Sequence, residues 1–175
     1  MKMTIVSALF CLVALPAAAQ HHAYHGQDGR EIKALSAEEV KQYLAGAGMG
    51  YAKAAELNHF PGPQHALELA DRLALDAAQR TGIQRLMDAH KAEARAIGAR
   101  LVESERALEA LFRSGKVDQS ALAQAVRGAA ALEGEYRLSH LETHRRMRDL
   151  LDAEQVKRYD ELRGYASGKA QHHKH

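Results

Sequence analysis

The sequence predicts an all-α protein built around a long antiparallel helical hairpin with short flanking helices. Residues 77–113 contain no proline, and their apolar positions recur at alternating steps of three and four. A second stripe of the same kind covers residues 122–150. This spacing is typical of helices that face a partner helix. The chain has no Trp and only three Phe, a composition that suits closely packed helices.

Residues 1–19 have the features of a secretory signal peptide. A lysine follows the initiator methionine, residues 3–15 form an apolar run, and small residues stand at Ala17 and Ala19. The run is too short to cross a bilayer, which needs about 20 apolar residues. We therefore expect cleavage after Ala19 and a mature periplasmic protein with no integral membrane segment. The only cysteine, Cys11, lies inside this leader.

The ends of the expected mature chain are polar and rich in histidine. Residues 20–35 and 166–175 are predicted to be disordered tails, because they contain too few apolar residues to form a core. Residues 36–165 have the length of one domain. The net charge of +2 comes from interspersed acidic and basic residues, so no concentrated basic face for nucleic acid is expected.

Local signals predict the short helices before the hairpin. Ser36 and Glu39 have the spacing of a capping box, so a helix is expected to begin there. That helix should end at Gly46, where three glycines follow in quick succession. Pro63 suits the first position of another helix, expected to run to about Leu73.

Capping residues also divide the rest of the chain. Asp76 is predicted to cap a helix over residues 77–113, which would be about 55 Å long at a rise of 1.5 Å per residue. Gly115 suits a left-handed helix exit, and Asp118 is expected to cap the second long helix. Asp152 should cap a last short helix that ends before Gly164.

The short break near Lys116 predicts that the two long helices fold back on each other, because neither can bury its stripe alone. Two residues whose numbers add up to about 232 should then lie at the same level. By this rule the start of the first long helix and the start of the last short helix meet at the open end of the hairpin.

A duplicated motif lies at this open end. Its two copies are Leu75-Asp76-Ala77-Ala78-Gln79 and Leu151-Asp152-Ala153-Glu154-Gln155. They resemble the Leu-Thr-x-x-Gln motifs of the Spy/CpxP family of periplasmic proteins, which includes the metal-responsive CnrX and ZraP types. The resemblance extends from about Ser36 to Tyr165, with Asp in place of Thr in both copies.

The resemblance implies a curved, helical and often dimeric protein. It implies two kinds of activity, ATP-independent chaperoning and sensing or buffering of divalent metals. The expected partners are a second copy of the chain, and either a membrane-bound signalling protein or unfolded periplasmic proteins. We expect no enzymatic activity, because His140 and His144 do not form a metalloprotease HExxH motif. The only Glu-x-x-His sequence, at Glu56, lies in the Gly/Pro-rich region.

Four histidines are candidate metal ligands. His140 and His144 are four residues apart and share one helix face, and the level rule places His90 opposite residue 142. His65 reaches the same level if its helix folds back along the hairpin. The resemblance to metal-sensing family members points to His65, His140 and His144. For any single histidine, a hydrogen-bonded core or boundary residue is the alternative reading.

The expected ion is a divalent transition metal, Zn, Cu, Ni or Co. Met147 is a weaker candidate as a soft ligand for copper, with a core position as the alternative. His21 and His22, close to the new amino terminus, are weak candidates for a square-planar Cu(II) or Ni(II) site. Imidazole must be neutral to bind, so binding should weaken below about pH 6.5.

The leading prediction is thus a periplasmic metal-binding stress protein. An ATP-independent chaperone is the alternative, with basic contacts from four arginines of the long helices, and a purely structural dimer is a third reading. These arginines are Arg95, Arg106, Arg137 and Arg145.

Overall fold

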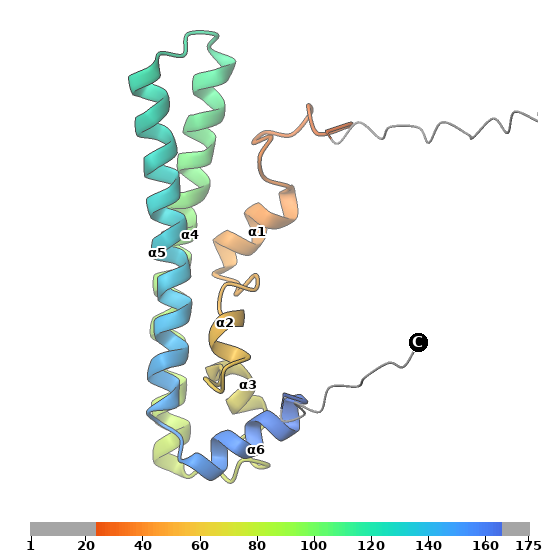
Figure 1. Ribbon diagram of the computed structural model, residues 1–175, viewed down its shortest axis with the longest axis vertical. Helices are drawn as coiled ribbons and strands as arrows, with labels where there is room; N and C mark the ends of the chain where they lie inside the picture. Colours follow the sequence, from red (N-terminus) through yellow and green to blue (C-terminus); the bar gives the residue numbers. More distant parts are fainter. Residues whose placement is uncertain (1–23, 166–175) are drawn as a thin grey trace, which may run out of the picture.

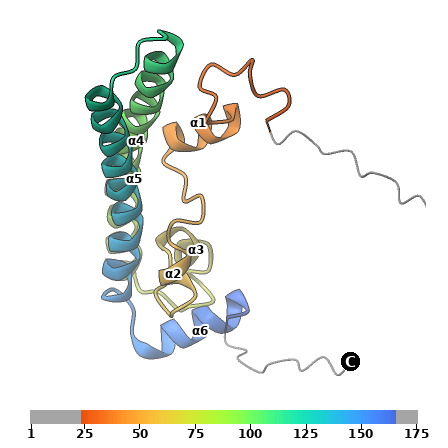
Figure 2. The same cartoon turned by 45° about the horizontal axis from the view of Figure 1, so that its top comes forward.

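The computed structural model describes residues 24–165, and this part of the chain is entirely helical apart from turns and loops. The long helices α4 (Ala77–Arg113) and α5 (Gln119–Arg148) lie side by side as an antiparallel hairpin (Figure 1). Three short helices, α1 (Ala37–Ala45), α2 (Lys53–Glu56) and α3 (Pro63–Glu68), follow one another along one side of it. The last helix, α6 (Ala153–Arg163), turns away across the open end (Figures 1 and 2).

The predicted hairpin and its caps are confirmed. Ser36, Asp76 and Asp152 each form a complete capping box with the residue three positions later, and Asp118 accepts a hydrogen bond from the Ala121 amide. Gly46 ends α1 with a left-handed backbone, as glycine allows at low cost.

The third helix ends earlier than predicted, at Glu68 instead of near Leu73. Leu73 and Leu75 are both buried in the core at the open end. Residues two apart lie on different faces of an α-helix, so a continuous helix could not bury both. The chain instead passes through turns, with a left-handed backbone at Ala74.

The register of the hairpin follows the level rule closely. The His90 Nδ1 atom lies 3.2 Å from the Ser139 hydroxyl oxygen, and Arg100 donates a hydrogen bond of 3.1 Å to Glu135. The rule predicts partners at residues 142 and 132, so each observed partner lies within three positions of the prediction. The register used to predict that His90 lies near His140 and His144 therefore agrees with the structure to within three residues.

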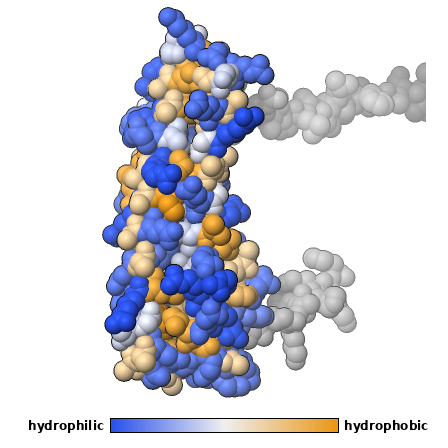
Figure 3. Space-filling model, turned by 90° about the vertical axis from the view of Figure 1, so that its left-hand side faces the viewer, coloured by the Kyte–Doolittle hydropathy of each residue, from blue (hydrophilic) through white to orange (hydrophobic). Residues whose placement is uncertain are grey.

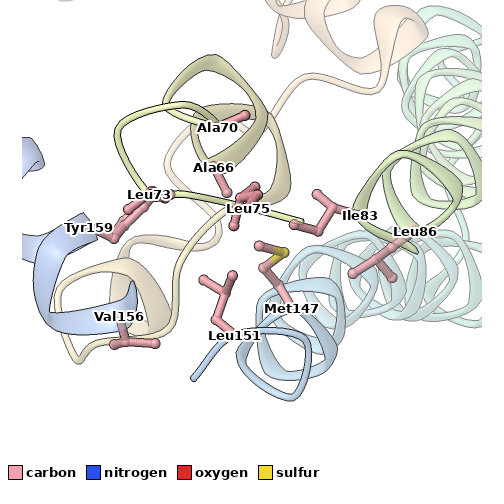
Figure 4. Packing of buried hydrophobic residues seen from close by; sticks show 10 residues of the cluster. All are labelled: Ala66, Ala70, Leu73, Leu75, Ile83, Leu86, Met147, Leu151, Val156 and Tyr159. Carbon is pink, nitrogen blue, oxygen red and sulfur yellow. The ribbon is translucent and has the colours of Figure 1, made fainter. Parts of the chain in front are cut away.

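Two buried clusters hold the short helices on the hairpin. The first closes the open end and combines residues of α3 to α6 and the α3–α4 turn (Figure 4). The Met147 side chain is fully buried there and points into the cluster, so it occupies the core position that was the alternative to a metal ligand. The second cluster packs α1 on the middle of the hairpin, with Tyr43 and Tyr136 in edge-to-face contact.

The packed part of the chain begins before the expected boundary at Ser36. Residues 24–35 form turns without a helix, yet Ile32 is only 3% exposed and belongs to the second cluster. Lys33 and Glu31 pair with Glu109 and Arg106 of α4. The predicted leader, His21, His22 and the tail at 166–175 lie outside the described residues.

The outer face of the hairpin, turned away from α1–α3, is mostly hydrophilic with separate apolar patches (Figure 3). Within residues 24–165, no helix combines the length and the apolar character needed to cross a membrane.

Candidate functional site

A cavity of about 690 Å³ lies between the hairpin and the segment that carries α1 to α3. All four predicted histidines line it: His65 from α3, His90 from α4, and His140 and His144 from α5. Side chains from three helices that are distant in sequence are thus brought to one hollow.

Gly62 lets the short segment approach the His144 ring, and Gly48 lies beside the His140 ring. A Cβ atom added at Gly62 would lie 3.0 Å from the Cε1 atom of His144, tighter than ordinary contact. One added at Gly48 would lie 3.9 Å from the Cδ2 atom of His140. The Pro-Gly-Pro turn and the glycine-rich loop therefore form the wall of the cavity opposite α5.

Each α5 histidine is held by a main-chain carbonyl group. The His140 Nδ1 atom lies 2.9 Å from the Tyr136 oxygen, and the His144 Nδ1 atom lies 2.8 Å from the Phe60 oxygen. A carbonyl oxygen only accepts hydrogen bonds, so in both neutral rings Nδ1 carries the proton and Nε2 carries the lone pair. The His140 Nε2 atom is buried and has no hydrogen-bond partner among the described residues.

His65 follows the same pattern, whereas the partner of His90 is a hydroxyl group, which can donate or accept and does not assign the ring proton. The His90 Nδ1 atom contacts the Ser139 hydroxyl, and the His65 Nδ1 atom lies 2.9 Å from a Glu68 carboxylate oxygen. In the described part of the chain, no hydrogen bond is made by the Nε2 atom of either ring.

Burial keeps the inner pair of imidazoles neutral. The rings of His90 and His140 meet edge to face with centroids 4.5 Å apart. Burial, followed by the nearby His140, His144 and Lys91, lowers the pKa of His90 to about 4. Burial also lowers the pKa of His140, although surrounding carbonyl groups, led by that of Tyr136, act in the opposite direction.

One carboxylate completes the wall near His144. The Glu56 Oε2 atom lies 3.5 Å from the His144 Nδ1 atom, and Oε1 accepts hydrogen bonds from Tyr159 and Tyr165 at 2.6 and 3.2 Å. Arg163 approaches the same carboxylate at 3.6 Å. Glu56 therefore links the cavity to α6 and to Tyr165, two residues beyond the end of that helix.

Beside the cavity, the two copies of the duplicated motif clasp the open end of the hairpin. Leu75 and Leu151 are buried, and the glutamines that end the two copies hydrogen-bond to each other. Residues 62–163, more than half of the chain, match the family model described as LTXXQ motif family protein. The chain belongs to the LTXXQ motif family.

The LTXXQ family is the Spy/CpxP-like group of periplasmic, non-enzymatic proteins. The resemblance seen in the duplicated motif is therefore confirmed. No curated protein and no solved structure matches this chain. In this LTXXQ protein Asp76 and Asp152 perform the capping that Thr could also provide, which explains how the fold tolerates the exchange.

The four histidines of this LTXXQ protein share a cavity without forming a compact ligand cluster. Among residues 24–165, no group of three or more His, Cys, Asp or Glu side chains is placed closely enough to hold a metal ion. His65 lies nearer the surface than His140 and His144, with 36% of its side chain exposed. Ligation by three or more of these groups would require the walls of the cavity to move together.

Sequence reasoning missed three residues of this cavity. Glu56 stands in the Gly/Pro-rich region, Met49 lies among the closely spaced glycines after residue 45, and Met87 lies within the apolar stripe of residues 77–113. The Glu-x-x-His spacing at Glu56 was the one available signal, but the structure pairs Glu56 with His144 and not with His59. His59 instead contacts Asp160 at 2.7 Å.

Proposed function

We propose that this LTXXQ-family protein is a periplasmic metal-binding stress protein that senses or buffers a divalent transition metal such as Zn, Cu, Ni or Co. One observation carries the proposal. In three of the four cavity histidines, His65, His140 and His144, an oxygen atom that accepts hydrogen bonds holds Nδ1, while Nε2 makes no hydrogen bond in the described part of the chain. Metal-binding histidines usually have this arrangement, because the outer oxygen fixes the tautomer and orients the ring.

The chemistry of the cavity suits borderline metal ions. Neutral imidazole is a good ligand for Zn, Cu and Ni, and the Glu56 carboxylate would add an oxygen donor beside His144. Burial holds His90 and His140 in the neutral form that binding requires.

The route from binding to a signal would be movement of the segment 45–65 against the hairpin. This segment carries Glu56 and His65, while His140 and His144 belong to α5. A metal that joins these ligands would draw the two parts together. Because Glu56 also accepts hydrogen bonds from Tyr159 and Tyr165, its shift would be transmitted to α6, where a membrane-bound signalling partner could detect it.

The alternative, an ATP-independent chaperone, is supported less well by the side chains named for it. Arg106 and Arg145 each pair with two acidic groups, Arg137 stacks over Tyr51, and Arg95 contacts the Ala45 carbonyl oxygen. Their charges are thus engaged within the chain. Suppression of the aggregation of a denatured client by the metal-free protein would favour this alternative.

We also propose that the protein forms a homodimer through the hairpin. Large apolar side chains are exposed on both long helices, including Phe112 on α4 and Val126 and Leu138 on α5. Leu138 is 64% exposed, the highest exposed fraction among these three. A molar mass of one chain in solution at micromolar concentration would contradict this proposal.

Calorimetric titration with Zn(II) tests the metal site. We expect one tight site in the full chain and a loss of affinity greater than about 10-fold in His140→Ala and His144→Ala, since even outer ligand contacts are worth about that much. His25→Ala is the matched control, because His25 is exposed and does not line the cavity. Equal affinities in all four proteins would reject the site.

A further inference from the structure

Two methionine side chains, Met49 and Met87, line the same cavity as the four histidines. Met87 lies three positions before His90 on α4, a spacing that places two side chains on one helix face. From this arrangement we infer that the cavity binds Cu(I) at a soft site made by the Met87 thioether with His90 and His140, and with Met49 as a second sulfur donor. The inference rests on the proposed function, because it uses imidazoles of the same cavity.

The donor set favours a soft monovalent ion. Thioether sulfur prefers Cu(I), whereas oxygen donors suit harder divalent ions. Imidazole and thioether are both neutral, so this end of the cavity offers no negative charge to offset a buried ion. Burying one positive charge costs less than burying two, which favours Cu(I) over a divalent metal here. The Glu56 carboxylate lies at the His144 end and is already engaged by Tyr159.

The loop around Met49 is shaped to approach the α5 histidines. Met49 has a left-handed backbone with φ of 45°, which is uncommon for a residue other than glycine. The preceding residue, Gly48, packs beside the His140 ring.

Met147, the third methionine among residues 24–165, lies in the hydrophobic core and not at the cavity. Met147 is completely buried and its side chain points into the apolar cluster at the open end (Figure 4). Met49 and Met87 are only partly buried and adjoin a cavity with imidazoles in its wall. An apolar packing role accounts for Met147, and Met49 also packs against the cluster that joins α1 to the hairpin. Met87 belongs to neither buried cluster and lines the cavity beside the histidines.

The test measures Cu(I) affinity by competition with a chromogenic Cu(I) chelator, without oxygen, in the full chain carrying Cys11→Ser. X-ray absorption at the copper edge then reports sulfur ligands, and with Cys11 replaced these can come only from methionine. We expect Met87→Leu to weaken Cu(I) binding by about 10-fold or more and to reduce the sulfur signal, with Zn(II) affinity unchanged. Met147→Leu is the matched control and should leave both Cu(I) affinity and the sulfur signal as they were.

The outcomes separate this inference from the proposed function. Zn(II) binding that needs His140 and His144, together with Cu(I) binding that is insensitive to Met87→Leu and lacks a sulfur signal, would overturn the Cu(I) site alone. If neither ion binds in a manner that depends on the cavity histidines, both proposals fail. Circular dichroism of each variant confirms that the helical fold is intact, and Met49→Leu gives a second, independent removal of sulfur.

Discussion

The side-chain amides of Gln79 and Gln155 hydrogen-bond to each other in both directions, Nε2 to Oε1, at 2.7 and 2.9 Å. Each Oε1 atom also accepts the main-chain N–H of its own capping aspartate. Each Nε2 atom also donates to a main-chain carbonyl, that of Leu150 or Leu73. Each amide therefore makes all four of the hydrogen bonds that it can form. This explains why a glutamine stands at the last position of the LTXXQ motif.

Removing either glutamine should destabilise the protein. In Gln155→Ala, the half-buried amide of Gln79 and the Leu73 carbonyl lose partners, an effect worth about 1–3 kcal/mol in the free energy of unfolding. Gln84→Ala is the control, since the Gln84–Asp88 pair is exposed, and should change the free energy by less than about 0.5 kcal/mol. Urea denaturation followed by circular dichroism measures both.

A double-mutant cycle gives a sharper test of the hydrogen bonds between Gln79 and Gln155. Gln79→Ala combined with Gln155→Ala should cost less than the sum of the single changes, because neither amide is then left without its partner. Strict additivity would mean that the two glutamines act separately.

The helix boundaries could be predicted from sequence because their causes are local. Ser36, Asp76 and Asp152 cap helices through side chains that reach only three residues ahead. The pairing of His90 with His140 was also accessible, since two straight helices joined by a short turn have one register. Neither conclusion needed knowledge of how the short helices pack.

The rest of the site depended on packing that the sequence does not display. The path of residues 69–75 is set by the burial of both Leu73 and Leu75, so the end of α3 was predicted too late. Met87 lies on the apolar stripe of α4 and Met147 on that of α5, yet one adjoins the cavity and the other is in the core.

Gly98 marks the closest approach of α1 to the hairpin and gives a second prediction. A Cβ atom at this position would lie 2.1 Å from the Tyr43 carbonyl oxygen, so Gly98→Ala must displace main chain and not only a flexible side chain. We expect a loss of about 1–3 kcal/mol in stability, although alanine favours helix by about 1 kcal/mol. Gly134→Ala is the control in α5. A Cβ atom at Gly134 would have no other atom within 4 Å, so this substitution should stabilise the protein by about 0.5–1 kcal/mol. Thermal and urea denaturation compare the two, and equal effects would show that α1 does not pack as described.

The third prediction concerns pH. Burial, followed by the neighbouring His140, His144 and Lys91, lowers the pKa of His90 to about 4 in the folded protein, against 6.5 for an unperturbed histidine. Between these values the unfolded chain binds more protons at this position than the folded chain, so the free energy of unfolding should fall as pH drops from about 6.5 towards 4. The contribution is fully present above pH 6.5. The pKa of His140 is also lowered by burial, so this residue acts in the same direction.

Denaturation at several pH values between 5 and 7 measures how steeply the free energy of unfolding changes with pH. His90→Gln should make this dependence shallower, because glutamine does not titrate. The range is chosen because the carboxyl groups with shifted pKa values in this chain, such as those of Glu39 and Glu142, mostly have pKa values below the ordinary one of 4.5. An NMR titration of the His90 ring with a midpoint near 6.5 would contradict the prediction. A low midpoint has a consequence for metal binding: the His90 imidazole then stays neutral below pH 6.5, so for this ligand the loss of binding expected from an ordinary histidine should move to lower pH.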